Sequence, residues 1–489
     1  MALKKSLLLI VLGLWLGLGA WPGYAADKDL DLLNELETEA KPKKKSADSD
    51  LDLLDDLKDD KTPKKKSAFE PIKKLGTNFG GSLRFRYIRY LRGVAERTGA
   101  DLDFNHYDYI LKLNTSTSGE HWSFKIEGWA EGGNQANTFG GYSRWFQDTQ
   151  KDTVRHFEIN ELYFALNFDS FDFTLGKKTF KNGLSTLFSP ADRTRPQISH
   201  DPFDPKDIGL WQARLDFYLS SYTFSGVIFP VYQAGKNWPS SSRWSGSTQN
   251  NDNRDSEHRN DSDVEEEYPQ INMDSVGYFV RVKTTLSGWD VFASMYQGPN
   301  AYTVIREEDR GGASPVKVKE VVRVGDYAVG FSTTYKKLEL HGETLFNWSY
   351  DSKDDNYFNY VIGFTYTIDD WAKYLFLDRI DITLEYAGEW LVYEQSATNY
   401  TDSSRKSRSG RNDVFSRIVF KVNEDLKFTY ASNVEFIESG WYNYFGVEYK
   451  FKCGLTWTIA GETFAGNEEG YYGRWWRNDR IYTVFEYPF

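Results

Sequence analysis

The sequence contains a single cysteine, Cys453, among 489 residues, so no disulfide bond forms within the chain. It also lacks the GxSxG, HExxH and CxxCH motifs, which argues against a recognisable hydrolase, a zinc site of that kind and a c-type haem. These absences lead us to expect a protein that is not an enzyme and that binds neither metal nor cofactor.

Positive charge is in deficit. The chain has 59 Lys and Arg against 71 Asp and Glu, a net charge of −12. Binding to nucleic acid depends on clustered Lys and Arg that neutralise phosphates. We therefore expect no nucleic-acid partner.

Long apolar runs are confined to the N-terminus. Residues 1–25 combine Lys4 and Lys5, an apolar run over 7–20 and the small residues Gly23 and Ala25. This pattern is typical of a cleaved secretory signal peptide. Beyond it, no stretch reaches the 18 or so apolar residues that indicate a membrane-spanning helix.

Aromatic residues are nevertheless abundant, with 32 Tyr, 34 Phe and 16 Trp, although the mean hydropathy is −0.60. Both properties follow if apolar and polar residues alternate. In "HWSFKIEGWAE", Trp122, Phe124 and Ile126 alternate with Lys125 and Glu127. This period of two predicts strands with one apolar and one polar face, and it recurs from about residue 80 to the C-terminus.

The connections between these strands decide between a soluble sandwich and a membrane barrel. We predict about 18 antiparallel strands, in which short turns such as "SS", "SG" and "KK" alternate with long polar connections at 134–153, 181–208, 233–274 and 298–319. Short turns on one rim and long loops on the other are typical of a transmembrane β-barrel with both termini in the periplasm. An exception is "DDWAKYLFLD" (369–378), which we interpret as a small interfacial turn or helix on the short-turn rim. We thus predict an all-β fold with a signal peptide at 1–25, a disordered periplasmic segment at 26–70 and an outer-membrane barrel at 71–489.

The C-terminal strand supports this prediction. "RIYTVFEYPF" places Ile481, Phe485, Tyr487 and Phe489 on one face and ends on the aromatic residue. It resembles the signal by which Gram-negative outer-membrane proteins are assembled, which implies that the barrel insertion machinery and the outer-membrane lipid bilayer are partners. Pro488 departs from that pattern and is compatible only with a strand end, because proline has no N–H to donate.

The polar faces of the strands would line the interior. The predicted pore-lining residues are Asp108, Lys112, Lys125, Glu127, Glu131, Glu161, Arg214, Arg281, Lys283, Glu339, His341, Glu343, Glu385 and Glu389. Acids outnumber bases in this set, so we expect a modest preference for cations. Each side chain taken singly has a plainer interpretation, as a solvated or paired lumen residue.

An 18-stranded barrel is too wide to be filled by its own wall. The connection at 181–209 combines apolar residues with four prolines, and we predict that it folds inward as a constriction; a lid over the mouth is the alternative. Its charged residues are Asp192, Arg193, Arg195, Asp201, Asp204 and Asp207, which would set a field across the narrowest point. By contrast, we expect the charged connection at 233–274 to be mobile at the cell surface.

The segment from "FTLGKKTF" to "IFPVY", residues 173–232, resembles a broad, largely uncharacterised group of porin-like barrels of Gram-negative bacteria, with alginate-export-type channels as more distant relatives. The resemblance implies an outer-membrane channel for hydrophilic solutes. Two alternatives stay open: an outer-membrane partner of a periplasmic machine that moves lipid or polymer, and a porin sheath around an electron-transfer protein.

A repeat precedes the barrel. "DLDLLNELETEAKPKKKSA" returns 21 residues later as "DLDLLDDLKDDKTPKKKSA". Leucines at Leu30, Leu33, Leu36, Leu51, Leu54 and Leu57 share one side of a two-turn helix that is too short to persist alone. A solvated spacer is the plain interpretation. Since the order of residues is repeated, we hypothesise that these leucines dock on a periplasmic protein, with two copies raising avidity.

Overall fold

The computed structural model describes residues 78–93, 101–134, 157–237, 242–244, 265–311, 315–468 and 470–489. The predicted signal peptide and the repeats, including the six leucines predicted to dock on a partner, lie outside the described residues. Among the described residues, no helix has the length and apolar character to cross a membrane.

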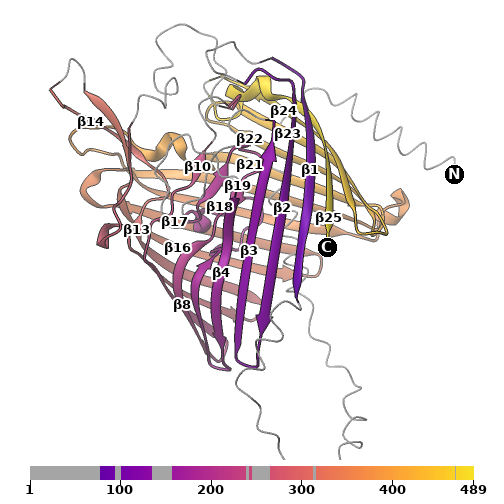
Figure 1. Ribbon diagram of the computed structural model, residues 1–489, viewed down its shortest axis with the longest axis horizontal. Coiled ribbons are helices and arrows are strands. Elements are labelled where there is room, and N and C mark those ends of the chain that lie inside the picture. Colours follow the sequence, from indigo (N-terminus) through magenta and orange to yellow (C-terminus); the bar gives the residue numbers. More distant parts are fainter. Residues whose placement is uncertain are drawn as a thin grey trace, which may run out of the picture.

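The fold is all-β, and its main element is a closed antiparallel sheet of 18 strands (Figure 1). The strands are β1 (Phe79–Tyr90), β2 (Asn105–Ser118), β3 (Trp122–Gly133), β4 (Phe157–Asn167), β5 (Phe171–Lys178), β8 (Leu210–Leu219), β9 (Tyr222–Phe229), β12 (Gly277–Leu286), β13 (Trp289–Pro299), β16 (Arg323–Tyr335), β17 (Leu338–Ser349), β18 (Asn356–Ile368), β19 (Arg379–Tyr393), β21 (Asn412–Lys421), β22 (Leu426–Glu435), β23 (Gly440–Lys450), β24 (Thr456–Gly466) and β25 (Arg480–Pro488). Each pairs with the next along the chain, and β25 pairs with β1. The predicted number of strands is confirmed.

Smaller elements lie in the long connections, apart from the 3₁₀ helix η7, which lies in the turn between β18 and β19. They are the strands β6 (Gln197–Ser199), β7 (Lys206–Asp207), β10 (Lys236–Asn237), β11 (Glu265–Glu267), β14 (Val304–Glu308), β15 (Val316–Glu320) and β20 (Tyr400–Asp402), and the 3₁₀ helices η3 (Pro190–Asp192), η5 (Met273–Ser275), η6 (Tyr350–Ser352), η7 (Ala372–Leu375), η8 (Ser404–Ser407) and η9 (Gly473–Asn478). The hairpin that contains β14 projects from one end of the barrel (Figure 1).

The tight turns on the short-turn rim use residues with positive φ angles. Between β12 and β13 only Ser287 and Gly288 intervene, with φ of 51° and 84°. Two successive positive φ values belong to the hairpin turn whose twist matches that of the strands, and glycine adopts such a φ without a steric penalty.

Closure of the barrel explains how Pro488 is tolerated. The backbone N–H of Gly81 donates to the carbonyl of Phe489, and the N–H of Phe489 donates to Gly81, both at 2.9 Å. Pro488 lies opposite Ser82, and on its other side the pairing with β24 stops at Thr456 and Glu486. The proline nitrogen therefore has no ladder partner to lose.

The outer wall carries large exposed apolar side chains in three zones. Near the long-loop end are Tyr87, Tyr107, Phe157, Tyr278, Tyr327, Trp348 and Trp390. Near the short-turn end are Tyr222, Trp289, Tyr335, Tyr366, Tyr449 and Tyr487. Between them lie Val280, Val329, Ile362, Leu384 and Ile459. Two aromatic girdles around an aliphatic band are typical of a barrel that crosses a membrane.

Candidate functional site

The connection between β5 and β8, residues 179–209, is the candidate functional site, and we name it the inner loop. Its first anchor is Glu343 on β17. The carboxylate accepts backbone N–H groups from Leu184 and Ser185, the latter at 2.6 Å, and the hydroxyl of Ser189 at 2.7 Å. At this anchor the wall therefore binds mainly the backbone of the loop.

Glu385 on β19 binds the next turn in the same way. Its Oε1 accepts the N–H groups of Thr186 and Leu187 at 2.9 Å each, and its Oε2 accepts that of Phe188 at 2.8 Å. The Nε2 atom of His341 lies 2.7 Å from Oε1, and both side chains are fully buried. Such charge-assisted bonds are about twice as strong as neutral ones, so these two carboxylates hold residues 184–188 firmly.

The far end of the inner loop is anchored by ion pairs with β1 and β25. Asp201 contacts Arg480 at 2.5 Å and Arg86 at 3.2 Å, while Asp204 contacts Arg84 at 3.0 Å and Arg86 at 3.1 Å. Burial alone would raise the pKa of the Asp201 carboxyl, but the guanidinium groups of Arg480 and Arg86 outweigh it and lower that pKa. The guanidinium groups of Arg84 and Arg86 likewise lower the pKa of Asp204, so both aspartates are charged at neutral pH.

Aromatic packing reinforces both anchors. The ring of Phe188 stacks on that of Phe415 from β21, with centroids 5.3 Å apart and planes 6° apart. Phe203 stacks on Tyr442 from β23 at 4.5 Å and meets Phe464 from β24 at 4.6 Å. The apolar residues that made 181–209 unusual for a solvated loop thus bury themselves on the wall.

These contacts place the inner loop within the barrel. Residues 184–188 bind β17 and β19, whereas residues 201–204 bind β1 and β25, far away around the ring of strands. A segment that touches well-separated parts of the inner face of a closed barrel lies inside it. The alternative of a lid across the mouth does not account for these contacts.

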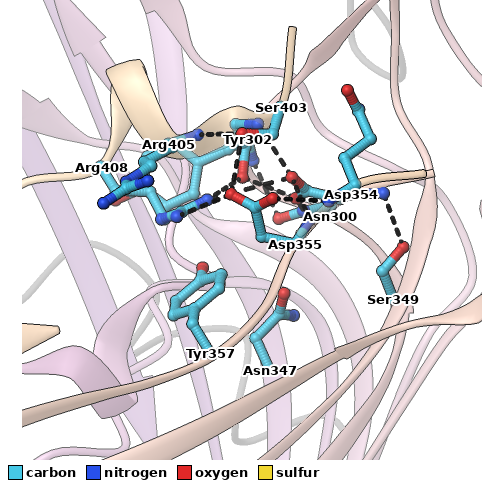
Figure 2. Close-up of polar contacts among 12 residues, drawn as sticks. Asn300, Tyr302, Asn347, Ser349, Asp354, Asp355, Tyr357, Ser403, Arg405 and Arg408 are labelled. Atoms are coloured by element: carbon cyan, nitrogen blue, oxygen red, sulfur yellow. Dashed lines mark hydrogen bonds and ion pairs between the residues drawn. The ribbon is translucent and has the colours of Figure 1, made fainter. Parts of the chain in front are cut away.

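A third contact joins the inner loop to the connections at the long-loop end. Arg193 donates to the hydroxyl of Tyr357 and, at 2.6 Å, to Oδ1 of Asn300. Figure 2 shows the network that surrounds them, in which Arg408 points toward the carboxylate of Asp355. This carboxylate lies 3.1 Å from Nη2 of Arg408.

Residues of three connections take part in this network: those between β13 and β16, between β17 and β18, and between β19 and β21. Arg408 forms two hydrogen bonds with Glu389, at 2.7 and 2.8 Å, and its guanidinium lies 3.9 Å from the ring centroid of Tyr357. Asp354 accepts the N–H and hydroxyl of Ser404 at 2.8 and 2.6 Å. The connections at this end are thereby fixed to one another around the entrance.

Several predicted pore-lining residues contact the inner loop or each other. Lys206 of the loop reaches Glu131 at 2.5 Å, and Thr179 donates its hydroxyl to Glu161 at 2.8 Å. Lys125 bridges Glu127 and Glu161 at 2.8 and 2.7 Å.

The other predicted residues lie elsewhere on the wall. Asp108 pairs with Arg86 at 2.7 Å and Arg214 with Asp216 at 2.7 Å, while Lys283 lies 4.0 Å from Asp290. Arg281 lies over the ring of Phe292 at 4.9 Å, Glu339 lies 3.8 Å from Nδ1 of His341, and Lys112 is exposed. That these side chains line a conducting path stays a prediction.

Most of the charged residues predicted for the constriction form hydrogen bonds or ion pairs. Asp192 accepts the N–H groups of Asn182 and Gly183 at 2.5 and 3.0 Å, and Arg195 pairs with Asp207 at 3.1 Å. Together with the ion pairs of Asp201 and Asp204, these contacts fix the loop. A field across the opening from these groups stays a prediction.

One expectation about the connection at 233–274 is wrong for residues 242–244, whereas most of the described residues at 265–274 are exposed. Ser242, Arg243 and Trp244 are buried rather than solvated. Arg243 lies over the ring of Tyr90 at 3.6 Å and donates to the carbonyl oxygens of Asp103 and Arg92, at 2.7 and 3.0 Å. The signal for this packing was the tryptophan itself, because a large apolar ring in a polar stretch needs a partner.

Sequence reasoning also missed Arg480, Glu462 and Arg408. Arg480 and Glu462 face each other in the register of β24 and β25, and both are buried. Alternation assigns both to the inner face, but it does not identify Asp201 of the inner loop as the partner of Arg480.

Comparisons with known proteins concern the fold. No protein-family model matches the chain, and no curated protein matches it in sequence. Similar solved structures include OccK9 (OpdG) of Pseudomonas aeruginosa, with 10% identity, a TM-score of 0.46 and coverage of 84% of this chain and 98% of that one. OmpF of Salmonella typhi in complex with daunomycin is 10% identical, with a TM-score of 0.40 and coverage of 84% of this chain and 97% of that one. A mutant porin of Rh. blastica is 11% identical, with a TM-score of 0.39 and coverage of 84% and 99%. At these values the likeness carries no argument about solute or activity.

Proposed function

We propose that this protein is a channel of the Gram-negative outer membrane, with the short-turn rim in the periplasm, through which hydrophilic solutes pass alongside the inner loop. The observation that carries the proposal is the inner loop itself, which is bound inside a closed barrel by Glu343, Glu385, Asp201 and Asp204. A loop fixed inside a barrel narrows the lumen, and a narrow, polar lumen is what a diffusion channel requires.

Conductance in planar bilayers tests this function. The refolded barrel is expected to give steady steps of conductance, and liposomes that contain it are expected to swell in small sugars but not in large oligosaccharides. Heat-denatured protein is the control. A folded barrel that is silent in both assays would overturn the proposal.

We further propose a modest preference for cations, because carboxylates outnumber bases among the predicted pore-lining residues. A gradient of KCl across the bilayer gives the sign of the reversal potential. The likeness to alginate-export-type channels stays a prediction.

The repeat at 29–68 favours a second candidate function, that of an outer-membrane partner for a periplasmic machine that moves lipid or polymer. Affinity purification with and without residues 27–68 tests it, since a periplasmic protein that depends on the repeats is expected only with the longer chain. The third alternative, a sheath around an electron-transfer protein, fits less well, because such a protein would have to displace the inner loop from its anchors.

A further inference from the structure

The turn between β18 and β19, residues 369–378, differs from the others on its rim. The turns at 220–221, 287–288 and 336–337 are only two residues long, whereas this one contains the 3₁₀ helix η7. Lys337 of the neighbouring turn pairs with Asp369 and, at 2.6 Å, with Asp370, which ties the two turns together. The segment therefore has a defined position, and we name it the foot.

The foot folds back onto the outer wall rather than over the opening. Its Ala372 is fully buried and Leu377 is 8% exposed, and both pack in one cluster with Ile380, Ile382 and Phe420. Ile380 and Ile382 alternate along β19 with Asp381 and Thr383, and they share their face with Leu384, which lies in the aliphatic band of the outer wall. The surface that the foot covers is thus a continuation of the wall that faces lipid.

The opposite side of the foot is apolar and uncovered. Tyr374 and Trp371 are 84% and 77% exposed, which makes them the two most exposed large apolar side chains among the described residues. Phe376 is 63% exposed and has a φ of 61°, a left-handed conformation that is costly for a bulky residue. The fold thus holds an aromatic ring outward at the expense of backbone strain.

We infer that the foot is a lipid anchor, with Trp371, Tyr374 and Phe376 in the headgroup region of the periplasmic leaflet. The foot continues the girdle formed by Tyr366 and Tyr335 at the same end of the barrel. Trp and Tyr are enriched at this depth because their rings are apolar with one polar atom. The inference rests on the proposed function, since it takes the outer wall to face lipid and the short-turn rim to face the periplasm.

Nitroxide labels at three positions test the anchor in reconstituted vesicles. Cys453 is the control, because it is the natural cysteine and lies exposed in another turn of the same rim, between β23 and β24. In a Cys453→Ser background, Tyr374→Cys reports on the foot and Val329→Cys on the aliphatic band. Heat-modifiable migration on gels confirms that each variant is folded. We expect labels at 329 and 374 to collide more with oxygen than with a water-soluble nickel chelate, and the label at 453 to show the reverse.

The outcomes separate the inference from the function on which it rests. If the label at 374 is as accessible to nickel as the label at 453 while the label at 329 lies in lipid, the lipid anchor is overturned but the membrane barrel is not. Accessibility of 329 to nickel overturns the membrane barrel itself. Dipolar broadening at 374 that disappears on dilution with unlabelled protein shows that a second copy covers the foot, which also overturns the lipid anchor.

Discussion

Glu385→Gln removes one negative charge from the anchor that holds residues 186–188 of the inner loop. The glutamine oxygen can replace Oε1 and keep the N–H groups of Thr186 and Leu187, but its amide nitrogen then faces the N–H of Phe188. One charge-assisted hydrogen bond is lost and two donors are opposed, at a cost of about 2–4 kcal/mol. Because each 1.4 kcal/mol changes an equilibrium constant tenfold, the ratio of docked to undocked loop falls by roughly 30-fold to 700-fold.

Single-channel recording measures this shift. The wild-type barrel is expected to show one main conductance level, and Glu385→Gln is expected to add brief visits to a larger level; with Glu343→Gln in the same chain, the larger level should dominate. Glu339→Gln is the matched control, because Glu339 lies on the same strand as Glu343 but contacts Ser332 and His341 instead of the inner loop. Wild-type levels and dwell times in the folded double variant would refute the reasoning.

Four further predictions follow from the described contacts and from the sequence. Arg408→Ala should destabilise the long-loop end by about 3–5 kcal/mol, because it leaves the buried carboxylates of Glu389 and Asp355 without their cation. Arg405 is exposed, so Arg405→Ala should not destabilise this end and serves as the control. The unfolding temperature of each variant, measured by heat-modifiable migration on gels, tests both expectations. The stability that the ion pairs of Asp201 contribute should stay constant from pH 8 down to about pH 5, since a lowered pKa keeps Asp201 charged and this contribution is lost only as the pH falls below ~4 toward that lowered value; the difference in unfolding temperature between the wild type and Asp201→Asn measures it, and loss of that difference near pH 6 would contradict this. Phe489→Ala should reduce the amount of folded barrel in the outer membrane at an unchanged rate of synthesis, because it removes the ring that lies 6.5 Å from that of Phe79 and with it the terminal aromatic residue of the predicted assembly signal. Replacing all eight leucines of the repeats with serine should abolish co-purification of a periplasmic protein and leave conductance unchanged; retention of that protein would count against docking.

The barrel itself was predictable because its determinants are local. Alternation of apolar and polar residues can be recognised from neighbours in the sequence alone, and it assigns each residue to one face of a strand. An example is Trp122, Phe124 and Ile126, which alternate with Lys125 and Glu127. The number of strands and the contrast between short turns and long connections followed from the same pattern.

The anchors of the inner loop were not predictable, for a physical reason. Glu385 binds Thr186 across 199 positions of sequence, and it binds a backbone N–H, which every residue except proline offers. Nothing in the side chains of residues 184–188 therefore marks them as partners of an acid. Trp244 shows the converse, because the ring signalled burial although its polar surroundings favoured solvent.

The two anchoring acids differ electrostatically from the other acids of the wall. Asp108, Glu131 and Glu161 each pair with a Lys or Arg, so their field cancels over a short distance. Among the described residues, Glu343 and Glu385 form no ion pair with Lys or Arg. Backbone N–H dipoles bind both carboxylates, and Nε2 of His341 also lies 2.7 Å from Glu385. An N–H dipole lowers the energy of a charge without neutralising it.

The cation preference should therefore depend on the same two carboxylates that hold the loop. The Glu343→Gln and Glu385→Gln double variant is expected to widen the channel and to weaken its cation preference together. Glu131→Gln combined with Lys206→Gln should change selectivity less, because it removes a cation together with an acid and leaves the net charge of the wall unchanged. Reversal potentials in a KCl gradient distinguish the cases. A double variant that conducts more and keeps its selectivity would show that the preference arises from other charges, and that anchoring and selectivity are separate properties of this wall.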